Sequence, residues 1–445
     1  MPTWLKKWQP EDPKFWRETG RRFAWRTLTI TTIALIFSFA IWFLMSALVV
    51  RLPGIGFKYT DMQLFWLAAM PGLAGGTLRM LHTFLIPVFG TRHVVTIATL
   101  LKLFPAVGIG LAVLNPQTPF WLFLILAFSA GLGGGDFSSF MPSTSLVFPK
   151  RLQGTALGLQ AGIGNFGVTV VQFITPWIIG FAVFGAATGG PRVFTTATGA
   201  TRNLWLQNAA FIYVPFLVIM GILAWVFLRS VPVRASFREQ MDIFKNKHTW
   251  FCTITYMMTF GSFSGFSATF PLMIKSVYGG FADAPDPLKF AFLGPLVGSL
   301  FRILIGPVSD KIGGAVLTTV SGLIMIGSAI AMVFSGVFTP DSTGQFPLFV
   351  ILMLVIFLAS GTGNASTFRQ YPIIFAHSPR QGAGVIGWTA AIAAYGPFIW
   401  STFIGLAISR AGSPAPFFYG LAGFYVIATF VNWFYYQRKG CERPS

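Results

Sequence analysis

Charged side chains are scarce in this sequence, and acidic ones are the scarcest. Only 10% of the 445 residues are charged, and Asp and Glu together number 12, whereas about a quarter of an average soluble protein is charged. Apolar residues make up 54% of the chain and the mean hydropathy is +0.69. These proportions exclude a set of soluble domains and predict a polytopic membrane protein.

Cysteines and the usual catalytic patterns are also nearly absent. Cys252 and Cys441 lie far apart and form no CxxC or Cys/His spacing, so neither a disulfide framework nor a metal site is supported. No Ser/His/Asp, HExxH or paired-carboxylate arrangement is visible. We therefore expect no enzyme, no metal and no cofactor. A membrane enzyme and a channel remain the alternative classes.

Apolar runs of about 20 residues fill almost the whole chain. They predict an all-α membrane protein with twelve spans, at roughly 27–50, 62–86, 93–114, 119–147, 153–183, 204–228, 249–274, 288–309, 315–338, 346–375, 381–409 and 415–436. The expected domains are an amphipathic arm (1–26), a six-helix bundle (27–229), a linker (230–248), a second six-helix bundle (249–437) and a tail (438–445).

The net charge of +19 would suggest a nucleic-acid partner in a soluble protein. Here membrane topology explains it, because 20 of the 31 Lys and Arg residues fall in the termini and the even-numbered connections. The positive-inside rule places those segments in the cytoplasm and residues 184–203 in the periplasm. We expect a monomer in the lipid bilayer that binds no nucleic acid.

The two six-span halves repeat each other. Gly90 follows Arg79 by eleven residues in the first half, and Gly313 follows Arg302 by eleven in the second. The run 133–154 also matches the run 361–382 without a gap. Two matched six-helix halves are the plan of the major facilitator fold, which binds its substrate between the halves near mid-membrane. Channels do not need such halves.

Arg79 and Arg302 are the strongest candidate binding residues. Each lies deep in its span, where a charge costs roughly 2.5–3.5 kcal/mol and cannot face lipid. Asp136 is the one acid well within a span, so the interior keeps excess positive charge that attracts an anion. A guanidinium offers paired donors that suit planar oxyanions, carboxylates and phosphates. The alternative is that both arginines are structural and bond to backbone carbonyls.

Three other polar residues in the spans have open roles. His82 could relay a proton, or it could stay neutral beside Arg79 and bond a neighbouring helix. We expect Asp136 to bond backbone or face a neighbouring helix, because a carboxylate in the pocket would weaken anion binding. The sequence alone does not indicate a role for Lys102. Small-residue rows at Gly154, Gly158 and Gly162, and at Ala383, Gly387 and Ala391, would let helix backbones touch and slide.

Long motifs in both halves resemble the nitrate signatures and seventh helix of the NarK nitrate/nitrite porters. They are Gly133-Gly-Gly-Asp-Phe-Ser-Ser, Ala156 to Val168, Lys247-His-Thr-Trp, Thr259 to Phe266 and Gly361-Thr-Gly-Asn-Ala-Ser. The resemblance covers essentially the whole chain. It implies a bacterial inner-membrane carrier whose partners are nitrate and nitrite.

The same resemblance implies the site residues. One arginine from each half, Arg79 and Arg302, would hold the anion. Asn165 and Tyr256 match polar residues of that site, and Phe137 and Phe260 match the rings that sandwich the anion. Without the resemblance, Asn165 could equally make an interhelical bond, and a phenylalanine is more often core or lipid-facing. Members of the family often carry asparagine where this chain has Asp136.

Glycines and a gating loop complete the predicted set. The signature glycines are Gly133, Gly135, Gly164, Gly361 and Gly363, although packing alone also explains glycines in membrane helices. The segment Gly306 to Gly314 resembles the superfamily's cytoplasmic gating loop, with Asp310 and Arg369 as gate residues, while the first-half counterpart at Gly90 lacks the aspartate.

The transport mechanism follows from the charge of the predicted pocket. Two arginines repel each other until an anion enters, so the carrier should rock quickly only when loaded. This favours nitrate/nitrite antiport. Nitrate/proton symport is the alternative, and His82 and Asp136 are the two residues that could couple it.

Overall fold

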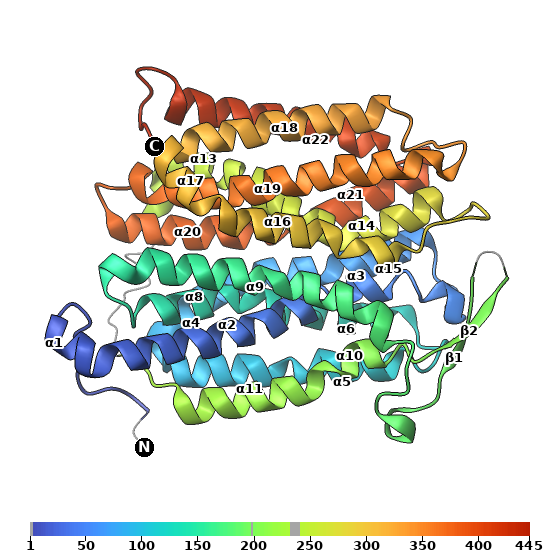
Figure 1. Ribbon diagram of the computed structural model, residues 1–445, viewed down its shortest axis with the longest axis horizontal. Coiled ribbons are helices and arrows are strands. Elements are labelled where there is room, and N and C mark those ends of the chain that lie inside the picture. Colours follow the sequence, from blue (N-terminus) through green and yellow to red (C-terminus); the bar gives the residue numbers. More distant parts are fainter. Residues whose placement is uncertain (1–2, 197–198, 232–240) are drawn as a thin grey trace.

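The computed structural model describes residues 3–196, 199–231 and 241–445, and most of these residues are helical (Figure 1). The helices of the first half are α1 (Pro13–Phe15), α2 (Arg21–Trp42), α3 (Leu44–Leu48), α4 (Asp61–Leu101), α5 (Leu103–Ala112), α6 (Phe120–Ala130), α7 (Leu132–Gly135), α8 (Phe137–Ser145), α9 (Lys150–Ile178), α10 (Asn208–Phe211) and α11 (Tyr213–Phe227). A hairpin of β1 (Arg192–Thr195) and antiparallel β2 (Thr201–Leu204) lies between α9 and α10.

The second half continues the helical architecture. Its helices are α13 (Lys247–Tyr256), α14 (Ser262–Tyr278), α15 (Pro287–Ala291), α16 (Leu293–Leu304), α17 (Gly306–Ile312), α18 (Gly314–Phe334), α19 (Phe346–Ile374), α20 (Pro379–Ala393), α21 (Gly396–Ala411) and α22 (Ala415–Asn432). Figure 1 shows α13–α22 along one side of the molecule and α1–α11 along the other. Both termini lie at one end, and the hairpin lies at the opposite end.

Eleven helical stretches in the described ranges are long and apolar enough to cross a membrane. They correspond to all the predicted spans except 249–274. That segment is helical but interrupted, because α13 ends at Tyr256, a π-helical turn η5 occupies Met257–Gly261 and α14 begins at Ser262. The predicted seventh span is therefore helical throughout, with a π turn between α13 and α14.

The repeated glycines after the two arginines both occupy backbone conformations that favour glycine. Gly90 has φ 76° and interrupts α4, and Gly313 has φ 102° between α17 and α18. A Cβ atom at Gly90 would also collide with the side chain of Ser230 and lie 2.9 Å from the ring of Trp4. Each half thus bends at the same place in the repeat.

The N-terminal arm packs against the first half. Trp16 is 4% exposed. The indole Nε1 of Trp8 donates to the carbonyl oxygen of Leu146 at 3.1 Å. The backbone N–H of Leu5 donates to the carbonyl oxygen of Ser230 at 2.9 Å. The arm therefore covers the connections at the end of the molecule that carries the termini.

The hairpin was not predicted from the sequence, and it lies beside a charged contact between the halves. Arg51 Nη2 lies 2.5 Å from Asp286 Oδ1, and Arg202 Nη2 lies 3.8 Å from Asp286 Oδ2. The ring of Phe194 lies near both cations, with its centroid 5.1 Å from Arg51 Cζ and 5.4 Å from Arg202 Cζ. These groups hold the halves together at the hairpin end.

The halves are in close contact at the hairpin end and separated at the end with the termini. A Cβ atom at Gly405 on α21 would lie 2.8 Å from Phe65 Cβ on α4. At the other end, Gly154 and Gly158 on α9 and Gly387 on α20 face open space, with no heavy atom within 4 Å of an added Cβ. Within the predicted small-residue rows, Gly154, Gly158 and Gly387 thus have no close neighbour in this conformation, whereas an added Cβ at Gly162 would lie 2.6 Å from Ile303 of the second half.

Candidate functional site

Arg79 lies on α4 and joins the two halves. Its side chain is completely buried. Nε donates to the carbonyl oxygen of Gly134 in α7 at 2.8 Å, and Nη1 donates to the carbonyl oxygen of Ala390 in α20 at 2.7 Å. Nη2 makes no hydrogen bond to any residue that the structure describes. The carbonyl bonds expected of a structural arginine are present, but one nitrogen with two N–H donors is left for a ligand.

Arg302, on α16, is held less fully. It is 6% exposed, and neither Nη1 nor Nη2 makes a hydrogen bond within the described part of the chain. Buried donors without partners are costly, because the protein has removed them from water without replacing those bonds. Two unused nitrogens on a buried cation therefore indicate a place for an anion.

The ring of Phe260 lies close to both arginines. Its centroid is 5.3 Å from Arg79 Cζ and 5.9 Å from Arg302 Cζ, so both guanidiniums lie over the same ring. The ring of Tyr256 stacks on Phe260 at 5.5 Å with an interplanar angle of 6°. Electrostatic interactions also couple Tyr256 to both arginines, and its side chain lies within hydrogen-bonding range of Arg302. Four predicted binding residues are thus brought together.

Other aromatic rings also lie close to the two arginines. Phe137, predicted from the resemblance, lies with its ring centroid 4.8 Å from Arg79 Cζ. Sequence reasoning missed Trp42, whose ring lies 5.0 Å from Arg79 Cζ, and Phe368, whose ring lies 5.0 Å from Arg302 Cζ. Phe368 belongs to the repeated run, which could have drawn attention to it, whereas Trp42 carries no such signal.

Asn165 is buried on α9 with an unsatisfied amide. It is 0% exposed, and neither its Oδ1 nor its Nδ2 has a hydrogen-bond partner among the described residues. The interhelical bond considered as the alternative is therefore not formed there. Asn165 follows Gly162 by three residues, and a Cβ at Gly162 would lie 2.6 Å from Ile303, the neighbour of Arg302. This places Asn165 near the boundary between the halves.

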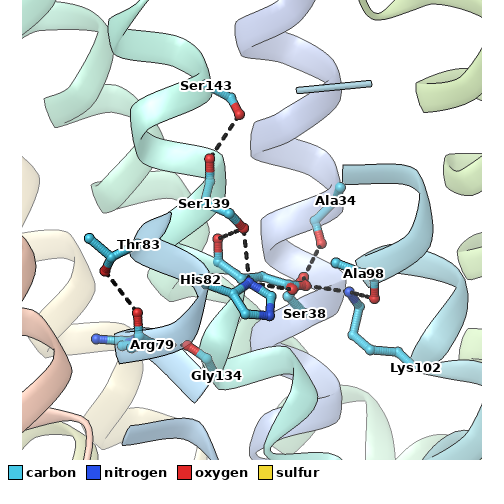
Figure 2. A network of polar contacts seen from close by, with 11 residues as sticks. Ala34, Ser38, Arg79, His82, Thr83, Ala98, Lys102, Gly134, Ser139 and Ser143 are labelled. Carbon is cyan, nitrogen blue, oxygen red and sulfur yellow. Dashed lines mark hydrogen bonds and ion pairs between the residues drawn. The ribbon is translucent and has the colours of Figure 1, made fainter. Parts of the chain in front are cut away.

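Lys102, which the sequence could not place, forms a buried ion pair with Asp136 (Figure 2). Both side chains are 0% exposed. The hydroxyl of Ser38 donates to the same carboxylate at 2.6 Å. His82 bonds the neighbouring helix, which is the second of its two open roles, with Nδ1 3.0 Å from Ser139 Oγ, and it lies 3.8 Å from Asp136 Oδ1.

This ion pair determines the net charge of the buried groups between the two halves. Asp136 faces a neighbouring helix, as expected, and Lys102 already neutralises it. In the described ranges, the ion pairs with Asp, Glu or the chain terminus include neither Arg79 nor Arg302. The positive charge between the halves is therefore uncompensated, and an anion would compensate it.

The signature glycines are positions of close helix packing. A Cβ at Gly133 would collide with the backbone of Ser38 on α2, and one at Gly361 would collide with the backbone of Gly298 on α16. The remaining three would press on side chains: Gly135 on Leu78 and His82, Gly164 on Leu35, and Gly363 on Thr259. Packing accounts for all five, and it brings helices close around the arginines.

The predicted gate residues form an ion pair at the end with the termini. Arg369 Nε on α19 lies 2.5 Å from Asp310 Oδ1 on α17, and both side chains are partly exposed. In the first half, Arg92 instead stacks on Trp225, with Cζ 4.3 Å from the ring centroid. The contacts at the predicted gate therefore differ between the two halves.

Known proteins are similar to this chain in both sequence and fold. Residues 28–382 match the Major Facilitator Superfamily. The chain is 60% identical to the probable nitrate/nitrite antiporter NarK2 of Thermus thermophilus, over 99% of this chain and 98% of that one. It is 35% identical to the nitrate/nitrite transporter NarU of Escherichia coli, over 98% of this chain and 96% of that one.

Solved structures with low sequence identity show the same fold. A bacterial homologue of the human lysosomal transporter Spinster, solved in an inward-facing and occupied conformation, aligns with a TM-score of 0.66 at 14% identity, over 92% of this chain and 96% of that one. The nucleoside transporter NupG aligns with a TM-score of 0.60 at 14% identity, over 91% of this chain and 98% of that one.

Proposed function

Since the chain belongs to the major facilitator superfamily, and within it to the NarK nitrate/nitrite porters, we propose that it exchanges nitrate for nitrite across a bacterial inner membrane. Its relatives are named as transporters or antiporters of these anions. In this proposal the substrate binds between Arg79 and Arg302, and the two six-helix bundles, 27–229 and 249–437, rock around it.

One observation carries the proposal. Three guanidinium nitrogens, Nη2 of Arg79 and Nη1 and Nη2 of Arg302, are buried without hydrogen-bond partners in the described structure, and one flat ring, that of Phe260, lies beside both cations. A small planar oxyanion can accept from donors on two sides while its faces contact rings. A sugar or a large apolar solute would need far more hydrogen-bonding or apolar surface than these groups offer.

The closed hairpin end and the open space at Gly154, Gly158 and Gly387 support alternating access. With the orientation expected from the positive-inside rule, both termini are cytoplasmic and the hairpin is periplasmic. The site would then open towards the cytoplasm. Closing that end around an empty site would leave two cations facing each other with no anion between them. Exchange avoids this cost, because each half-cycle carries an anion.

The test is transport by purified protein in proteoliposomes. We expect rapid nitrate uptake into vesicles loaded with nitrite and slow uptake into anion-free vesicles. Unlabelled nitrite should compete, whereas tetrahedral sulfate should not, because its shape does not fit between flat rings. Strong uptake into anion-free vesicles, driven by an inward proton gradient, would replace antiport with nitrate/proton symport. Absence of nitrate uptake under both conditions would refute the substrate.

A further inference from the structure

The segment that holds Arg79 in place has almost no side chains of its own. α7 reads Leu-Gly-Gly-Gly and is followed by Asp136, where the fourth span breaks before α8 begins. Glycine backbone has the largest conformational freedom in the chain and the most to lose on ordering. The carbonyl of Gly134, which accepts from Arg79 Nε at 2.8 Å, therefore needs an anchor nearby.

Asp136 supplies such an anchor two residues further along the chain. Its carboxylate is bonded from two directions: Lys102, at the end of α4, forms the ion pair, and Ser38 on α2 donates at 2.6 Å. Lys102 Nζ also donates to the carbonyl oxygen of Ala98 at 2.8 Å, so the lysine is itself fixed. The buried pair thereby ties the glycine segment to two neighbouring helices.

The second half lacks this anchor. Asn364 stands at the repeat position of Asp136, and neither polar atom of its amide has a partner in the described structure. α18, the counterpart of the helix that bears Lys102, contains no charged residue. Arg302 correspondingly keeps two unbonded nitrogens where Arg79 keeps one. The two arginines are related by the repeat, but they are not held alike.

We propose that Lys102 and Asp136 are positioning residues for Arg79: their ion pair fixes the α7 backbone so that the Gly134 carbonyl holds Nε and Nη2 is presented to the anion. The proposal rests on the proposed function, since it concerns the affinity of the same site. It assigns the pair no contact with the substrate. In this proposal the guanidinium of Arg79 is held in one position, whereas the guanidinium of Arg302 adjusts its position to the anion.

The decisive variant is the double substitution Lys102→Met with Asp136→Asn. Removing both charges together avoids the large penalty of leaving one buried charge alone, so the protein should keep its melting temperature. We expect the KM for nitrate to rise about tenfold, as for one lost hydrogen bond to a charged group, with kcat little changed. A pair that served folding alone would leave KM at the wild-type value.

Two further variants make the result decisive. Ser38→Ala loosens the carboxylate without changing any charge and should raise KM about threefold, less than the double variant. Lys247→Met with Glu442→Gln removes an exposed ion pair of 2.7 Å at the end with the termini, keeps an amide oxygen as partner for His248 Nε2, and should leave KM unchanged.

The outcomes separate this inference from the proposed function. A folded double variant with the wild-type KM overturns the positioning role. If the double variant does not fold, an unchanged KM in Ser38→Ala overturns it. An equal rise in KM in the exposed-pair control also overturns it. Failure of the wild-type protein to transport nitrate would instead refute the proposed function.

Discussion

Replacing Arg302 by lysine is the sharpest test of recognition by two guanidiniums. Because Nη1 and Nη2 of Arg302 bond no described residue, the change removes no protein hydrogen bond at those nitrogens, and the ammonium keeps the positive charge. The loss is the planar fork with its paired donors. A hydrogen bond to a charged group contributes about 1.5–3 kcal/mol. Losing one should therefore raise the KM for nitrate about ten- to a hundredfold.

Arg79→Lys should be more damaging than Arg302→Lys. Arg79 also donates to the carbonyl oxygens of Gly134 and Ala390 at 2.8 and 2.7 Å, and one ammonium cannot reproduce both bonds and still present a donor to the anion. The difference between the two variants thus reports how differently the arginines are held.

Initial rates of nitrate uptake into nitrite-loaded proteoliposomes, measured over a range of nitrate concentrations, would give KM and the maximal rate. Arg410→Lys is the matched control, because Arg410 is exposed at the hairpin end of α21 and should tolerate the change. Wild-type KM and rate in Arg302→Lys would refute recognition by paired donors. So would equal losses in the control.

Three further predictions concern other parts of the chain. Asn165→Asp should abolish uptake, because a carboxylate about 4 Å from the anion costs about 4 kcal/mol at an effective dielectric constant of about 20; measurable uptake would remove Asn165 from the site. Thr195→Cys, made with Cys441→Ser, should react with impermeant thiol reagents on whole cells, and labelling only from the cytoplasmic side would invert the topology. Asp310→Asn breaks a partly exposed pair with Arg369 of a kind that contributes roughly 0–1 kcal/mol. It should slow exchange at nearly unchanged melting temperature and KM, and an unchanged rate would argue against a gate.

The sequence predicted what depends on local pattern and internal repetition. Apolar runs of membrane length located the spans. Arg79 and Arg302 could be singled out as candidate binding residues, because a charge in the middle of a span is conspicuous and because the spacing after the two arginines matches. Phe260 and Tyr256 depended on the resemblance, since nothing in the pattern separates a ring beside a ligand from a ring in the core.

The remaining features depend on contacts between distant segments. Lys102 and Asp136 are 34 residues apart on different helices, and no periodicity pairs them. Trp42 reaches Arg79 because α2 packs beside α4, which composition does not reveal. The hairpin 192–204 forms within a connection whose sequence shows no clear alternation. The break in the span 249–274 is a change of hydrogen-bond pattern without a proline to mark it.

The π turn at Met257–Gly261 makes the site depend on the length of the chain as well as on its composition. Successive residues of an α-helix are rotated by about 100°, and a π turn accommodates its wider i→i+5 pattern within that progression. Deleting one residue between Tyr256 and Phe260 would restore the α-helical pattern and leave three steps between these rings instead of four, so that they would lie about 300° apart around the helix axis rather than nearly one full turn. The parallel stack of Tyr256 on Phe260 would then be lost, and the ring shared by the two arginines would be redirected although every side chain of the site was still present.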